Sequence, residues 1–236
     1  MSSSMFTYEE NNVVKTILSG CNVLVNFLMG VIVALPLLFA VVKDFNEPSA
    51  PDNIIMLHIL LCVPGYQLLM SHSFLSLCPY NSWSSTLKKA NQRRAHWILQ
   101  LLASGMAISG SIIIMINKDT NFTTTHGRLG LSALIFTMLN LITGVPTLFA
   151  HSLKRFIPKS VFKLIHIILG ITAFALATSC LCHGYNKESF RTWTNDRVTS
   201  GIIAFTVIFT FLMLVNPLIT LGKKVYRLIE EYRMRY

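Results

Sequence analysis

AHWILQLLASGMAISGSIIIMIN, residues 95–117, runs for twenty-three residues without an Asp, Glu, Lys or Arg. About 20 predominantly apolar residues are enough for a helix to cross the ~30 Å hydrocarbon core of a bilayer. In water a helix of this length needs a polar face, and this stretch has none. The stretch therefore predicts a membrane-spanning helix.

Five further stretches have the same character, so that the sequence predicts six spans, at residues 16–42, 54–78, 95–117, 129–150, 164–183 and 198–222. Hydrophobic residues make up 53% of the chain and charged residues 13%, which excludes a disordered chain and does not suit a water-soluble domain. We predict an all-α, polytopic membrane protein that forms one helical bundle. Its parts are an N-terminal segment 1–15, a six-helix membrane domain 16–222 and a basic tail 223–236.

The basic residues are concentrated on one side of the predicted membrane. Fourteen of the 20 Lys and Arg residues belong to the N-terminal segment, the second and fourth connections between spans, or the C-terminal tail. The other six are balanced by six acidic residues. Because Lys and Arg are enriched in cytosolic loops, both termini are predicted to be cytosolic. This topology accounts for the net charge of +10 and argues against a nucleic-acid partner.

Four of the seven histidines form two pairs at matching depths of the predicted spans. His58 and His126 are near the non-cytosolic ends of their helices, and His96 and His166 are near the cytosolic ends. Ionisable residues within a membrane usually serve a function. Two neutral imidazoles on facing helices can supply both axial ligands of a haem iron, which favours electron transfer over oxygen chemistry. We interpret the two pairs as two haem sites, one in each leaflet.

Other interpretations stay open at this stage. Zinc is disfavoured because two histidines leave its tetrahedron unfilled. The four histidines can also simply bond backbone carbonyl groups of neighbouring helices. His72 lies fourteen residues after His58, but Asn140 occupies the equivalent position after His126, so His72 is interpreted as a neighbour of a haem site or a packing residue. At the level of function, a haem-free transporter or channel and a membrane scaffold are the alternatives, although the spans lack the acidic residues typical of transporters.

Three local strings carry a resemblance to a known family: HWILQLLA starting at His96, THGRLGL around His126 and KLIHIILG around His166. With six spans and histidines on spans two to five, the chain resembles the cytochrome b561 family, and most closely its short branch of b561 domain-containing proteins. One departure is Ile59 after His58, where the family often has Pro. The resemblance implies two b-type haems per chain. It implies that His96 pairs with His166 and that His58 pairs with His126.

The resemblance further implies a transmembrane, ascorbate-dependent oxidoreductase of the monodehydroascorbate or ferric reductase type. The sequence has no G-x-G-x-x-G motif for a bound dinucleotide, so the electron donor must be small and diffusible. Lys88, Lys89, Arg93 and Lys159 precede the cytosolic histidines and are expected to attract ascorbate or pair with haem propionates, although topology explains them equally well. On the opposite side the expected acceptor is monodehydroascorbate or a ferric chelate. The interpretation allows a location in the endoplasmic reticulum, secretory or endolysosomal vesicles or the plasma membrane, and allows a homodimer.

Overall fold

The structure, a computed structural model, describes residues 12–46, 50–78, 81, 83–148 and 159–234. These residues form helices joined by short connections, and none of them lies in a β-strand. In chain order the elements are α1 (Asn12–Asn46), α2 (Ala50–Val63), η1 (Pro64–Leu69), α3 (Met70–Leu75), α4 (Lys89–Ile116), α5 (Thr125–Leu148), α6 (Lys159–Tyr185), α7 (Glu188–Thr194) and α8 (Asp196–Arg233).

Within the described residues, six helical stretches are long and apolar enough to cross a membrane: Thr16–Lys43, Asn53–Leu75, Lys89–Ile116, Thr125–Pro146, Val161–Tyr185 and Asp196–Arg233. The prediction of six spans in an all-α bundle is thus confirmed, and the chain is a multi-pass membrane protein. Large apolar side chains cover the outside of the bundle, as a lipid-facing surface requires; Phe27 is 64% exposed and Phe211 70%. The last span runs further than expected, since α8 continues past Gly222 to Arg233.

The second span is a composite of α2, η1 and α3. Pro64 has no backbone N–H to donate to the preceding turn, and at this residue the helix widens into the π-helix η1, Pro64–Leu69. The widened turn directs Tyr66 and Gln67 into the bundle, where both side chains are buried. The Tyr66 hydroxyl lies 3.2 Å from Thr137 Oγ1, and Gln67 Nε2 donates to Thr178 Oγ1 at 3.4 Å.

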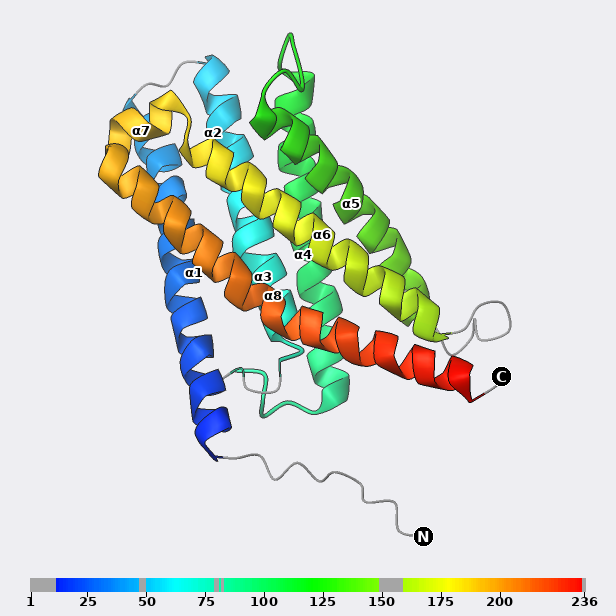
Figure 1. Cartoon of the computed structure of the whole chain (residues 1–236). Coiled ribbons are helices and arrows are strands. Elements are labelled where there is room, and N and C mark those ends of the chain that lie inside the picture. The colour runs from blue at the N-terminus through cyan, green and yellow to red at the C-terminus, as the bar shows by residue number, and fades with distance from the viewer. Residues whose placement is uncertain (1–11, 47–49, 79–80, 82, 149–158, 235–236) are drawn as a thin grey trace.

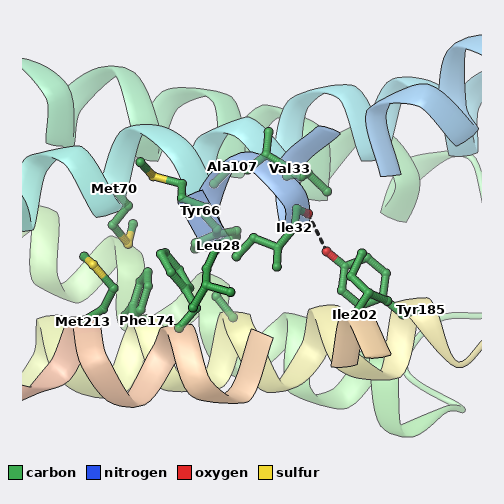
Figure 2. Close-up of a cluster of buried hydrophobic side chains, with 14 of the residues drawn as sticks. Leu28, Ile32, Val33, Tyr66, Met70, Ala107, Phe174, Tyr185, Ile202 and Met213 are labelled. Atoms are coloured by element: carbon green, nitrogen blue, oxygen red, sulfur yellow. Dashed lines mark hydrogen bonds between the residues drawn. The ribbon is translucent and has the colours of Figure 1, made fainter. Parts of the chain in front are cut away.

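Four spans form the centre of the bundle, and α1 and α8 lie along one side of it (Figure 1). α5 packs along α6, and α2 packs along α4. α1 and α8 contact each other and cover α2 and α6 respectively. Figure 2 shows the buried apolar side chains where these elements meet, with Ile32 from α1 and Phe174 from α6 among them; the Tyr185 hydroxyl donates to the Ile32 carbonyl at 2.7 Å. The start of α1 and the end of α8 lie at the same end of the bundle (Figure 1).

Candidate haem sites

The structure brings the four membrane histidines together in two pairs. His58 of α2 faces His126 of α5, and His96 of α4 faces His166 of α6. The ring centres are 6.3 Å apart in both pairs, and the ring planes are nearly perpendicular, at 85° and 86°. These are the same pairs that depth in the sequence predicts. Because the two members of each pair come from different helices, each pair can hold a group between those helices.

The separation of the rings fits a metal atom between them. A metal–imidazole nitrogen bond is about 2.0 Å long and a ring nitrogen lies about 1.1 Å from its ring centre, so two rings on opposite sides of one metal have centres about 6.2 Å apart. The observed 6.3 Å is this spacing in both pairs. Among the residues that the structure describes, His, Cys, Asp and Glu do not gather in groups of three or more, as a tetrahedral zinc site requires. Haem iron needs only two such ligands, because the porphyrin supplies the others.

The other nitrogen of each ring is bound to a backbone carbonyl group of a facing helix. His58 Nδ1 lies 2.9 Å from Gly110 O and His126 Nδ1 lies 2.9 Å from Cys180 O. His96 Nδ1 lies 3.0 Å from Ser73 O, and His166 Nδ1 lies 3.2 Å from Asn140 O. A carbonyl oxygen only accepts, so Nδ1 is the protonated nitrogen in all four rings. Nε2 therefore keeps the lone pair that a metal binds, the tautomer of a metal-ligating histidine.

These hydrogen bonds follow a regular spacing along the chain. On α4, α5 and α6, fourteen residues separate the histidine from the residue whose carbonyl serves the other pair: His96 and Gly110, His126 and Asn140, His166 and Cys180. On the second span the separation from His58 to Ser73 is fifteen residues. The π-helix η1 lies between them and absorbs the additional residue, because a π turn contains one residue more than an α turn. Ser73, and not His72, therefore faces the His96–His166 pair.

Two glycines lie directly against ligand-candidate rings. A Cβ atom at Gly144 would lie 3.3 Å from His166 Cε1, and a Cβ atom at Gly184 would lie 3.3 Å from His126 Cε1. Each glycine follows by four residues the carbonyl that holds the same ring, Asn140 or Cys180. One turn of α5 therefore contacts the His166 ring, through the Asn140 carbonyl and Gly144. One turn of α6 contacts the His126 ring in the same way, through the Cys180 carbonyl and Gly184.

A cavity of about 380 Å³ reaches the His58–His126 pair. Its inner wall includes Tyr66 and Gln67, and Lys118 and Lys187 line it at the end near the α4–α5 and α6–α7 connections. Most of its exposed wall is apolar. A haem has an apolar macrocycle with two carboxylates on one edge, so an apolar cavity with two imidazoles and two lysines suits its chemistry.

The residues expected to form the donor site are on the surface. Lys88, Lys89 and Arg93 are exposed at the start of α4. Lys159 is the first residue of α6, and its side chain lies outside the part that the structure describes. Of the remaining histidines, His72 stacks edge-on with Trp83, with ring centres 6.3 Å apart. His183 is exposed near the end of α6, and His151 lies outside the described residues.

Sequence reasoning did not identify the residues that hold the imidazoles. The Gly110, Cys180 and Asn140 carbonyls leave no trace in composition, because any residue supplies a backbone carbonyl. The fourteen-residue interval is a usable signal, but it is visible only once the four histidines are chosen. Ser73 lies fifteen residues after His58, and not fourteen, because of the π-helix between them. Pro64 and its neighbours do not predict a π turn from sequence.

The fold and these sites define a class: a multi-pass membrane protein whose four central helices hold two imidazole pairs at two depths. The comparisons with known proteins agree with this class. The family model for eukaryotic cytochrome b561 matches residues 57–191, which contain all four paired histidines. The chain is 30% identical over 166 residues to mouse (Mus musculus) transmembrane reductase CYB561D2, covering 67% of this chain and 72% of that protein. The bovine (Bos taurus) protein of the same name is 29% identical over the same shares, and the human (Homo sapiens) one is 30% identical over 54% of this chain and 59% of its own length.

The chain belongs to the cytochrome b561 family. It is therefore an oxidoreductase that transfers electrons across a membrane, and the family implies haem b as its cofactor. The predicted resemblance is confirmed. The family match begins within α2 and ends within α7, so that the outer helices α1 and α8 lie entirely outside it.

The contacts of Gly144 and Gly184 predict a local effect on cofactor binding. Gly184→Ala places a methyl group 3.3 Å from the His126 ring, and Gly144→Ala does the same to His166. Overpacking of a filled interior costs about 1–3 kcal/mol, so each variant is expected to lose roughly tenfold or more in haem affinity at one site. The measurement is the haem-to-protein ratio of the purified variants. Gly20→Ala is the matched control, since its Cβ would contact nothing within 4 Å. Equal haem content in all three variants would contradict the prediction.

Proposed function

We propose that the chain holds two haems, one between His58 and His126 and one between His96 and His166. We further propose that it carries electrons from cytosolic ascorbate to an acceptor on the other side of the membrane. The observation that carries the proposal is the equal 6.3 Å separation of the two imidazole pairs, each with its Nδ1 atoms bound to carbonyl groups. A single pair of facing histidines could also arise from packing contacts between helices. Two equivalent pairs in one four-helix core favour a route for electrons.

Bound haem supplies a one-electron carrier whose conjugated ring shortens the distance that an electron must cross. The protein contributes the spacing of the two sites. Fourteen residues of α-helix between a ligand histidine and the level of the other pair correspond to a rise of about 21 Å. The fixed Nδ1 hydrogen bonds hold each imidazole in one orientation during oxidation and reduction.

The register of two lysines supports a donor site beside the His96–His166 pair. Lys89 precedes His96 by seven residues and Lys159 precedes His166 by seven residues. Seven residues are close to two helical turns, so each lysine lies on the same face as the histidine, about 10 Å nearer the membrane surface. With Lys88 and Arg93 they form a basic rim that attracts an anion such as ascorbate. The distribution of Lys and Arg residues supports a cytosolic location for this rim.

The reaction balances as a one-electron transfer. An ascorbate monoanion gives up one electron and releases one proton to become monodehydroascorbate on the cytosolic side. On the other side one electron reduces a ferric chelate to its ferrous form, or reduces one monodehydroascorbate, which takes up a proton, to ascorbate. Lys118, which lines the His58–His126 cavity, is a candidate for acceptor contacts, together with Asn117, which directly precedes it, and Arg128, which lies near His126 in the sequence.

Replacing single histidines tests the assignment of the ligands. His96→Ala and His166→Ala are each expected to remove the same haem and leave the other in place, because one imidazole cannot hold the iron in six-coordination. His58→Ala and His126→Ala are expected to remove the other haem. The measurement is the haem-to-protein ratio and the reduced-minus-oxidised absorption spectrum of the purified variants. His183→Ala is the matched control, since His183 is exposed. Full haem content in the four variants would exclude these residues as ligands.

The basic rim predicts a donor dependence that salt weakens. Lys89→Gln together with Arg93→Gln is expected to raise the half-saturating ascorbate concentration about fivefold, if the two exposed charges contribute about 1 kcal/mol. Rising ionic strength is expected to slow reduction of the unaltered protein and to affect the double variant less. The control is Lys223→Gln with Arg227→Gln, which removes the same charge from the exposed end of α8. Identical ascorbate dependence in both double variants would show that Lys89 and Arg93 do not attract the donor, and the positive-inside rule would then be their only explanation.

The direction of electron flow depends on the orientation in the membrane. A reporter fused after Tyr236 is expected to be cytosolic, and a glycosylation tag inserted into the connection between α4 and α5 is expected to be modified. The measurement is reporter accessibility and the glycosidase-sensitive mass of the tagged protein. A luminal C-terminus would invert the proposal, because the basic rim would then face away from cytosolic ascorbate.

A further inference from the structure

Two of the four ligand-candidate histidines are held by clamps of the same design. At His96, the clamp is Ser73: its carbonyl lies 3.0 Å from Nδ1, its hydroxyl oxygen lies 2.9 Å from Nδ1, and this hydroxyl donates to His96 O at 3.1 Å. At His126, the clamp is Cys180: its carbonyl lies 2.9 Å from Nδ1, its sulfur lies 3.3 Å from Nδ1, and its thiol donates to His126 O at 3.2 Å. Both residues bridge the imidazole and the backbone of one histidine.

The two clamps differ in a single kind of atom. The backbone carbonyls are evenly matched, since each has one other partner. Ser76 Oγ donates to Ser73 O at 2.6 Å, and Cys180 lies within α6, where its carbonyl also accepts from the amide four residues later. The side chains are not matched, because a hydroxyl oxygen is a good hydrogen-bond acceptor and a thiol sulfur a weak one. His58 donates to the Gly110 carbonyl and also has the Cys62 sulfur 3.5 Å from its Nδ1, but the Cys62 thiol donates to Ala107 O and not to the backbone of the histidine. His166 donates to the Asn140 carbonyl of a facing helix.

We propose that this exchange of oxygen for sulfur sets the two haems at different reduction potentials, with the His96–His166 site lowered by Ser73 relative to the His58–His126 site. The inference rests on the ligand assignment of the proposed function. A stronger acceptor on Nδ1–H moves the proton away from the ring and makes Nε2 a more basic ligand, which stabilises ferric over ferrous iron. Ser73 and Cys180 act through the histidines and touch no reacting atom.

The sign of this difference matches the direction of the proposed reaction. An electron that enters beside His96 and leaves beside His126 moves from the site with the oxygen clamp to the site with the sulfur clamp. It therefore moves toward the higher potential, and the internal transfer is favourable.

Exchanging the two side chains tests the inference. Ser73→Cys is expected to raise the midpoint potential of the haem that His96→Ala removes. Cys180→Ser is expected to lower the midpoint potential of the haem that His126→Ala removes. In the double variant, the difference between the two midpoint potentials is expected to become smaller or to change sign. The measurement is a potentiometric titration of the absorption bands of the purified protein. Ser71→Ala is the control, because Ser71 is fully buried on the same helix and its hydroxyl has no partner.

Unchanged midpoint potentials in both single variants, with full haem content, would overturn the inference while leaving the ligand assignment intact. Shifts of the opposite sign would overturn it as well. Loss of haem from both variants would also overturn it, since Ser73 and Cys180 would then serve the assembly of the sites and not their potentials. Failure of the ligand assignment itself has a separate signature, which is retention of both haems in the four His→Ala variants.

Discussion

Each of the four central spans is tied to an antiparallel neighbour by hydrogen bonds from an imidazole Nδ1–H to a backbone carbonyl, and these bonds run in both directions. His58 reaches Gly110 while His96 reaches back to Ser73, and the α5–α6 pair is joined in the same way. The imidazole pairs themselves link one helix pair to the other. Nδ1 of each histidine therefore fixes the register within a helix pair. In the proposed haem sites, Nε2 would bind a metal between the pairs.

This arrangement gives buried polar groups partners without introducing charge into the membrane. An unpaired imidazole in hydrocarbon costs several kcal/mol, and carbonyl groups already present in the helices remove part of that cost. The close approach that this requires depends on small residues. At Gly110 an added Cβ would lie 2.8 Å from Cys62 Sγ, and at Gly65 it would lie 3.0 Å from Ala103 O. Small residues at helix contacts are the usual means by which membrane helices pack closely.

The sequence was sufficient for the number of spans, the helical class and the pairing of the histidines, because each of these follows from apolar length and from depth. It was insufficient for the partners of the imidazoles. Backbone carbonyls have no residue type, and the interpretation that the histidines bond carbonyl groups of neighbouring helices describes the Nδ1 atom of each ring. The role of Cys180 was equally hidden, since a lone cysteine in an apolar stretch resembles any packing residue. α7 and the extension of α8 to Arg233 also went unpredicted, since their charged residues do not distinguish a helix from a connection.

The π-helix of the second span has a consequence for how such chains are compared. Its one additional residue adds nothing to the height that the span must cover, so that residues after Gln67 are out of step with an uninterrupted α-helix. An alignment that treats the span as continuous will set His72 against the fourteenth-residue positions Gly110, Asn140 and Cys180 of the other three spans. A one-residue gap within Pro64–Leu69 restores Ser73 to that place, and with it the internal symmetry of the four helices.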